Sequence, residues 1–209
     1  MKKIFLLLFL CGIINFSFAQ SLHFGIKAGV NFSNLAASSS GITLTSSSST
    51  GFHVGAVADI GFANLSLQPG ILYSTKGGTY GDASSGTAKL TFNYVEIPVN
   101  LLYNIPIVVG KIFLGGGPYV GMGVSGKATL SGAATSTGSG SESQNITFGS
   151  GPNDTKNPDY GVNFLGGVRF KSGLALSVGY GLGLGNLSND NSGKIKNNVV
   201  SVSIGYFFL

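Results

Sequence analysis

The stretch Leu22-His-Phe-Gly-Ile-Lys-Ala-Gly-Val-Asn-Phe32 decides the fold class of this chain. Every even position in it is apolar, and the odd positions hold His23, Lys27, Asn31 and two glycines. Successive side chains of a β-strand point to opposite faces of a sheet, so this period of two predicts a strand with one apolar and one polar face. After residue 20, no apolar run approaches the roughly 18 residues that a membrane helix needs.

The same alternation recurs along the chain and predicts eight strands. They are expected near residues 21–33, 51–61, 65–76, 89–103, 110–126, 159–170, 173–185 and 197–208. The connections after the first, third, fifth and seventh strands are long and rich in Ser, Thr, Gly and Asn, at about 34–50, 77–88, 127–158 and 186–196. The other connections are short. This alternation is typical of an up-and-down outer-membrane barrel with tight periplasmic turns and larger external loops.

Composition separates a membrane barrel from a soluble one. Only 9% of the 209 residues are charged, whereas an ordinary soluble domain has roughly 25%. The polar row consists mostly of Gly, Ser and Asn, which suits a crowded interior, and the large apolar row fits better against lipid. Strands in hydrocarbon must close on themselves to leave no unpaired edge. We therefore predict an all-β fold, an eight-stranded antiparallel up-and-down transmembrane β-barrel, whose interior its own side chains fill.

A ten-stranded barrel is the alternative, if residues 128–130 and 146–148 form an extra hairpin. We favour the interpretation that these residues extend the fifth and sixth strands above the membrane. The outward row should also carry aromatic girdles at both interfaces. The expected girdle residues are Phe62, Tyr103, Phe170, Tyr206 and Phe208 at the periplasmic ends, and Phe32, Phe52, Tyr73, Phe92 and Tyr160 at the external ends.

The first residues have the pattern of a secretory signal peptide. Lys2 and Lys3 precede an apolar run that ends in Ser17-Phe-Ala-Gln20, which predicts cleavage after Ala19 and a barrel domain over residues 20–209. Cys11, the single cysteine, would be lost with the peptide, so no disulfide or cysteine-based metal site is expected in the barrel domain. The net charge of +5 is spread along the chain without a basic cluster, and no nucleic-acid partner is predicted.

Charged residues on the polar row must lie inside the barrel. Lys27 and Glu96 are expected near mid-height, and Asp59, Lys111 and Arg169 near the periplasmic turns. Charges buried in a narrow barrel must be paired, so we predict a pair of Glu96 with Lys27 and a pair of Asp59 with Arg169 or Lys111. The alternative is that each side chain reaches separately to the nearest mouth.

Other candidate chemical motifs are weak. Gly121-x-Gly-x-x-Gly126 has the spacing of a dinucleotide fingerprint, but no helix follows it. The oxygens of Asn153, Asp154, Asn157 and Asp159 lack a recognised calcium spacing. We therefore predict no cofactor-binding and no metal site.

Two histidines are the only plausible general bases. His53 is placed near the external end of the second strand, where Asp82 and several serines could approach, and His23 has the weaker case. No spacing ties His53 to a nucleophile or to an orienting carboxylate. We therefore predict that the protein is not an enzyme and that His53 is a hydrogen-bonded polar side chain near the barrel mouth.

Several stretches resemble the PorT-like outer-membrane β-barrel family, which is typical of Bacteroidota. They are Gly25-Ile-Lys-Ala-Gly-Val-Asn-Phe-Ser33, Gln68-Pro-Gly-Ile-Leu-Tyr-Ser-Thr-Lys-Gly77, Tyr94-Val-Glu-Ile-Pro-Val-Asn-Leu101, Gly115-Gly-Gly-Pro-Tyr119, Gly166-Gly-Val-Arg-Phe170 and Tyr180-Gly-Leu-Gly-Leu-Gly-Asn-Leu187. The Tyr-x-Glu-Ile-Pro piece is the most specific. One departure is that Leu209, not an aromatic residue, ends the chain. The resemblance implies a barrel in the outer membrane, and it implies almost nothing about an activity.

These observations favour a non-enzymatic outer-membrane protein with a closed lumen, which is structural or presents its external loops to partners. Both chain ends are expected in the periplasm. The expected partners are outer-membrane lipid, the assembly machinery during biogenesis and an unknown ligand of the loops. A narrow channel or lipid-handling barrel is the first alternative, which a continuous water path would favour. An outer-membrane enzyme using His53 is the second, which an Asp and a Ser within hydrogen-bond reach of His53 would favour.

Overall fold

The computed structural model describes residues 21–39, 42–82, 86–132, 140–149, 151, 154–189 and 194–208. The expected signal peptide, residues 1–19, lies outside these ranges. Within the described ranges, no helix is long and apolar enough to cross a membrane. The strands are β1 (Ser21–Ser39), β2 (Ile42–Thr45), β3 (Ser47–Phe62), β4 (Leu65–Asp82), β5 (Gly86–Ile107), β6 (Gly110–Ser131), β7 (Ser141–Ile146), β8 (Asp159–Phe170), β9 (Leu174–Gly183) and β10 (Lys194–Phe207).

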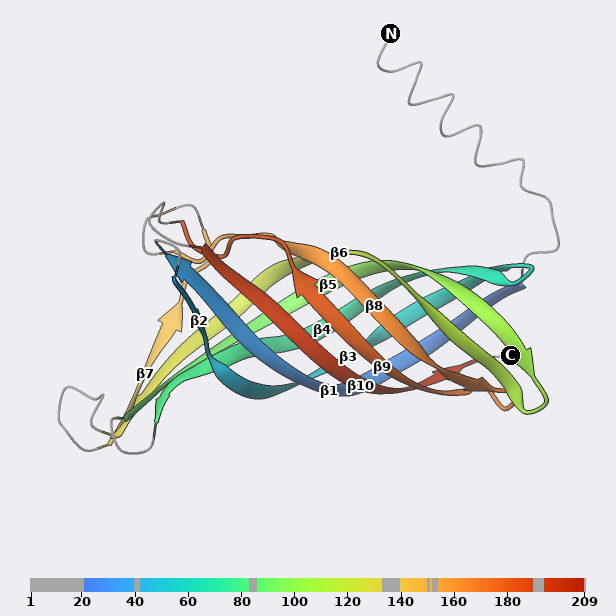
Figure 1. Ribbon diagram of the computed structural model, residues 1–209, viewed down its shortest axis with the longest axis horizontal. Coiled ribbons are helices and arrows are strands. Elements are labelled where there is room, and N and C mark those ends of the chain that lie inside the picture. Colours follow the sequence, from blue (N-terminus) through green and yellow to red (C-terminus); the bar gives the residue numbers. More distant parts are fainter. Residues whose placement is uncertain are drawn as a thin grey trace, which may run out of the picture.

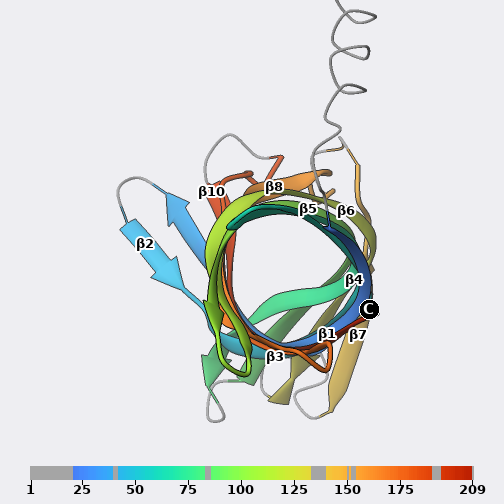
Figure 2. The same ribbon diagram turned by 90° about the vertical axis from the view of Figure 1, so that its right-hand side faces the viewer.

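Eight of these strands form one closed antiparallel ring. Their order is β1, β3, β4, β5, β6, β8, β9 and β10 (Figures 1 and 2). Strand β10 pairs with β1 from Gly25 opposite Phe207 to Ser38 opposite Lys194, and this pairing closes the ring. Closure leaves neither edge of the sheet unpaired, as a strand in hydrocarbon requires. The predicted eight-stranded antiparallel barrel is confirmed.

The two short strands are appendages of the ring. Strand β2 pairs with the end of β1, and β7 pairs with β6 from Gly126 opposite Ile146 to Ser131 opposite Ser141. Strand β8 begins at Asp159, opposite Gly121, so the part of β6 beyond that point needs another partner, and β7 supplies it. Residues 128–130 therefore extend β6, as we favoured. Ile146, however, belongs to β7 and does not extend β8, and the hairpin of β6 and β7 adds no strand to the ring.

A β-bulge separates the extension of β6 from its barrel part. Tyr94 lies opposite Gly123, whereas the preceding residue, Asn93, lies opposite Ser125. Val124 is thus the extra residue on β6. A one-residue shift in register moves every later side chain to the other face of the sheet. Beyond the bulge, the odd-numbered residues of β6 face outward, whereas they face inward below it.

The two ends of the barrel differ. The turn end carries the tight connections at residues 63–64, 108–109 and 171–173. It also holds the first described residue and the last, because the amide of Phe208 donates to the carbonyl of Phe24. The loop end carries the longer connections together with β2 and β7 (Figure 1, left). Consecutive connections of an up-and-down barrel lie at opposite ends, so the long connections gather at one end and the short ones at the other.

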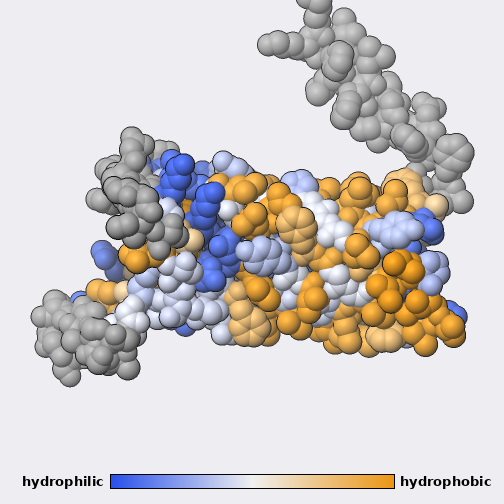
Figure 3. All heavy atoms as spheres, viewed as in Figure 1, coloured by the Kyte–Doolittle hydropathy of each residue, from blue (hydrophilic) through white to orange (hydrophobic). Residues whose placement is uncertain are grey.

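The outward and inward rows have the expected characters. Outward side chains are exposed and apolar, as at Val178 (61% exposed), whereas inward side chains such as Asp59 (2%) are buried and often polar. Figure 3 shows that the apolar surface covers the part of the barrel toward the turn end, while hydrophilic surface gathers toward the loop end. The strands therefore continue beyond the apolar band at the loop end.

Phe92 corrects the predicted aromatic girdle. It is 4% exposed and packs inside the loop end against Tyr94. On β5 the even-numbered residues face inward, and Phe92 shares that row with Tyr94 and Glu96. The other expected girdle residues for which an exposed outward side chain is recorded are Phe32, Phe52, Phe62, Tyr73, Tyr103, Tyr160, Tyr206 and Phe208.

Replacing Val178 by Arg should lower the free energy of unfolding in a bilayer by about 2 to 4 kcal/mol, because a cation near mid-membrane on the lipid face is costly. The matched control is Val108→Arg in a turn at the barrel end, where Val108 is exposed. There the loss should be at most about 1 kcal/mol. The measurement is urea unfolding of both variants in phospholipid vesicles. Equal losses at the two positions would contradict the assignment of the outward row.

Candidate functional site in the barrel interior

An ion cluster crosses the lumen near the turn end. Arg169 Nη1 lies 2.6 Å and Lys111 Nζ 3.1 Å from the same oxygen of Asp59, Oδ2. Lys111 and Arg169 are opposite each other on the neighbouring strands β6 and β8, whereas Asp59 is on β3, which pairs with neither. The guanidinium of Arg169 also lies over the Phe207 ring, 4.0 Å from its centroid. Three of the residues predicted for the interior are thus brought together across the barrel.

A second ion pair joins Glu96 to Lys76 on the neighbouring strand β4. Both side chains are buried, and the Lys76 ammonium lies over the ring of Tyr119, 4.4 Å from its centroid. Sequence reasoning paired Glu96 with Lys27 instead. That expectation compared heights counted from strand ends, which ignores the stagger between strands that closing a barrel requires. Lys76 shares the inward row with Leu72, which lies opposite Glu96, and this parity could have identified it.

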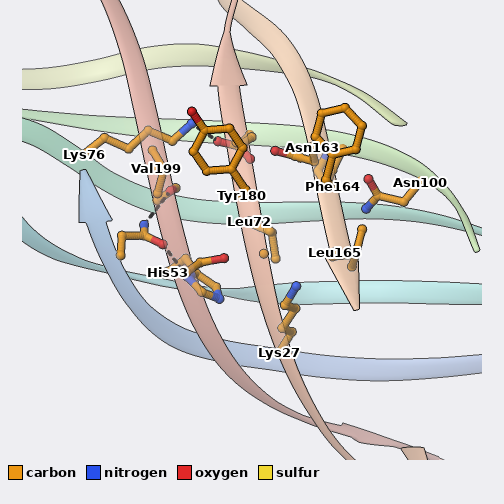
Figure 4. A pocket seen from close by; sticks show the side chains of 17 residues that line it. Lys27, His53, Leu72, Lys76, Asn100, Asn163, Phe164, Leu165, Tyr180 and Val199 are labelled. Carbon is orange, nitrogen blue, oxygen red and sulfur yellow. Dashed lines mark hydrogen bonds and ion pairs between the residues drawn. The ribbon is translucent and has the colours of Figure 1, made fainter. Parts of the chain in front are cut away.

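Lys27 points into a small interior cavity (Figure 4). The cavity has a volume of about 60 Å³, and its lining includes His53, Asn100 and Asn163. A second cavity of about 20 Å³ lies next to it, and Lys27 and Leu165 line both. A water needs about 10 to 15 Å³ of such space, so these cavities have room for a few waters and not for an organic ligand.

His53 belongs to a hydrogen-bond network whose proton positions can be worked out. The Asn31 amide nitrogen donates to the carbonyls of Phe52 (3.2 Å) and Thr75 (3.0 Å). The Asn31 carbonyl oxygen is therefore the atom that faces His53, and it accepts from Nδ1–H at 2.8 Å. In the neutral imidazole, Nε2 then carries no proton and accepts from the Ser203 hydroxyl at 3.0 Å.

This order of serine, histidine and orienting amide resembles that of a hydrolase triad. However, His53 is 5% and Ser203 4% exposed, and the neighbouring cavity is far smaller than the roughly 300 to 1,000 Å³ of a ligand pocket. An Asn, and not the Asp that would have favoured an enzyme, contacts the ring. The network instead links β1, β3 and β10 at the seam where the barrel closes.

Gly29 makes this link possible. In the register it lies between His53 on β3 and Ser203 on β10. A Cβ atom on Gly29 would lie 2.6 Å from Cε1 of the His53 ring. The imidazole therefore occupies the space above Gly29 on β1 and reaches Ser203 on β10.

An apolar cluster covers the loop end. Leu35, Phe92, Tyr94 and Leu187 form its buried centre. Phe148, from the segment after β7, packs edge-on against Phe92 and Tyr94, with ring centroids 6.2 and 5.9 Å apart. Sequence analysis missed this cap, because nothing in the alternation indicates that a loop residue folds back into the barrel mouth.

Two asparagines hold the segment that carries Phe148. Asn157 accepts from the amide of Gly123 and donates to its carbonyl, at 3.0 and 3.2 Å. The Asn189 amide nitrogen donates to the carbonyls of Gly149, Gly151 and Asp154, at 2.9 to 3.0 Å. The cap is therefore tied both to β6 and to the connection between β9 and β10.

The residues considered for a cation take separate positions. Asp154 accepts from the amide of Gly151, Asn157 binds β6, Asp159 is fully buried, and Asn153 lies outside the described residues. In the described part of the chain, no group of three His, Cys, Asp or Glu side chains could hold a metal ion. The glycines at 121, 123 and 126 all lie within β6, which continues past them as a strand.

A match to one protein family agrees with this architecture. Residues 18–189 match the model of a family described as outer membrane protein beta-barrel domain. The chain is also similar to the crystal structure of Neisserial surface protein A, with 17% identity, a TM-score of 0.44 and coverage of 88% of this chain and 97% of that one. The corresponding values for Ail of Yersinia pestis, in complex with the heparin analogue sucrose octasulfate, are 16%, 0.41, 90% and 99%. No curated protein matched the sequence.

A double-mutant cycle on Lys76→Met and Glu96→Gln should give a coupling energy of about 1 to 3 kcal/mol in a bilayer, because contacting buried charges couple strongly. The same cycle on Lys27→Met and Glu96→Gln is the control. We expect a smaller coupling there, since no ion pair joins those two side chains. The free energies come from urea unfolding in vesicles. A coupling for Lys27 equal to that for Lys76 would contradict the assigned pair.

Proposed function

The chain belongs to the outer membrane protein beta-barrel domain family, and we propose that it is a non-enzymatic outer-membrane barrel with a closed lumen, which presents its loop end to partners outside the cell. The single observation that supports a closed lumen most strongly is the ion cluster of Asp59, Lys111 and Arg169, which reaches across the interior. The Lys76–Glu96 pair and the cap around Phe148 add two barriers above it. A solute would have to displace all three in turn.

The loop end is suited to presenting a binding surface because its strands are held in place by side-chain hydrogen bonds. Strands β4, β5 and β6 continue beyond the apolar band and carry cross-strand hydrogen bonds between polar side chains. Thr75 donates to Asn93 at 2.8 Å, and Asn93 donates to Ser125 at 2.9 Å. Thr129 and Ser143 are linked in the same way between β6 and β7. Such ladders hold the extended strands together in water, and cross-strand pairs of this kind stabilise a sheet.

The positions of the tight turns and of the barrel's ends indicate its orientation in the membrane. The first and last described residues of the barrel lie at the turn end, which we place in the periplasm, as tight turns lie there in outer-membrane barrels. Export by the predicted signal peptide and insertion by the assembly machinery would precede this arrangement. The resemblance to the PorT-like family of Bacteroidota is consistent with a location in the outer membrane. We expect a ligand to bind the outer surface of the loop end, since the interior cavities have no room for one.

The unmodified barrel should give no stable conductance steps in planar bilayers, because ion pairs in a narrow lumen with little water block a continuous path. A variant that weakens all three barriers, with Asp59, Arg169, Lys76, Glu96 and Phe148 all replaced by Ser, should conduct. Far-ultraviolet circular dichroism checks that both proteins are folded. Large, stable steps from the unmodified protein would favour the channel interpretation over ours.

Single cysteines test the orientation, since Cys11 is the sole cysteine of the sequence and lies in the predicted signal peptide. We expect Gln144→Cys on β7 to react with a membrane-impermeant maleimide on intact cells. Val108→Cys at a tight turn should react only after the outer membrane is permeabilised. Both side chains are exposed, so a difference in labelling reports the compartment and not burial. The reverse pattern would invert the topology.

A further inference from the structure

The outward face of β6, β8 and β9 is interrupted by two glycines. One row across these strands holds Leu114, Gly166 and Val178, and the adjoining row holds Gly116, Phe164 and Tyr180. The two glycines are diagonal neighbours in this pattern. Each leaves a gap where its neighbours carry large side chains, and diagonal gaps merge into one depression.

This depression is a shallow, open groove in the outer wall. Its rim and floor include Leu114, Val162, Phe164, Val178, Tyr180 and Val200. Phe164 and Tyr180 lie opposite each other on β8 and β9, and both also border the interior cavity that Figure 4 draws. The hydroxyl of Tyr180 is the only polar side-chain atom among the lining residues, so the groove has almost nothing to offer a polar ligand.

The backbone does not require the glycine at 166. A Cβ atom there would meet its nearest neighbours at 3.5 and 4.0 Å, which is ordinary van der Waals contact. At Gly116, by contrast, a Cβ would lie 2.2 Å from the carbonyl oxygen of Asn163. Close approach of the strands thus explains Gly116, whereas the effect of Gly166 is to keep the outer surface hollow.

We propose that this groove binds one acyl chain of a membrane phospholipid. It lies within the outward apolar row, which membership of an outer-membrane family places in hydrocarbon, so the groove is continuous with the protein's lipid interface. Inside a bilayer, packing is decided by van der Waals contact, and small residues allow a partner to approach the backbone closely. A hydrocarbon chain is thin and flexible enough to follow the groove, and an unfilled groove would lose those contacts.

This inference rests on the membrane location alone and not on a closed lumen. It adds a ligand, a phospholipid tail, on the outer face of the wall and away from the loop end. A chain seated in the groove should exchange more slowly than the lipid around the rest of the barrel.

The test uses the full chain reconstituted in phosphatidylcholine vesicles with a trace of phosphatidylcholine that carries a diazirine at mid-chain. After photolysis, mass spectrometry maps the cross-linked residues. We expect adducts to concentrate on Phe164, Val178 and Val200. Gly166→Leu should lower the yield on these residues about fivefold, because its side chain occupies the groove that the tail would fill.

The matched control is Ala56→Leu, which adds similar bulk to an exposed outward position on β3, away from the groove. It should leave the adduct pattern unchanged. Circular dichroism and heat-dependent gel mobility check that both variants form the barrel. Adducts spread evenly around the apolar band, or a pattern that Gly166→Leu does not alter, would overturn the proposal. Cross-linked dimers that Gly166→Leu abolishes would overturn it as well, because the groove would then bind a second copy.

Discussion

Backbone groups that face hydrocarbon must find every hydrogen-bond partner within the protein. The pairing of β10 with β1 satisfies this constraint, and the other features of the barrel depend on it. Closure makes an even number of antiparallel strands and hence alternating connections. It also fixes a narrow interior, in which every second side chain of eight strands has to fit. The abundance of Gly, Ser and Asn on the inward row reflects that shortage of space.

The same narrowness determines how the interior charges are arranged. A charge that cannot reach water has to be neutralised by a partner across or along the wall. Asp59 contacts two cations from the opposite side, and Glu96 contacts one from the neighbouring strand. The hydrogen bonds of His53 with Asn31 and Ser203 likewise connect strands, with neutral groups, where β10 closes the barrel on β1. The contacts of Asp59 with Arg169 and Lys111, and that of His53 with Ser203, join strands that share no backbone ladder, so they brace the cylinder against flattening.

The sequence predicts the barrel well because one simple pattern, the alternation of two faces, is repeated in every strand. The expected strand 159–170 coincides with β8, and other boundaries differ mainly where strands continue beyond the membrane. Contacts across the lumen are harder to predict from the sequence. They depend on the stagger between strands, which the alternation does not encode. For that reason Lys76 was overlooked as the partner of Glu96. The cap around Phe148 was missed because it depends on tertiary contacts of a loop, and the groove because it is made by the absence of side chains.

Val124, the extra residue of the bulge in β6, marks a border between two patterning rules. Below it, large apolar side chains face outward and small or polar ones inward, as hydrocarbon demands. Above it, Lys127 and Thr129 face outward while Phe92 and Ile146 pack beneath them, which is the rule of a water-soluble sheet with its own small core. A single inserted residue thus lets one continuous strand face hydrocarbon in its lower part and water in its upper part. Evolution of the exposed part can therefore follow the constraints of a soluble protein while the barrel below keeps those of the membrane.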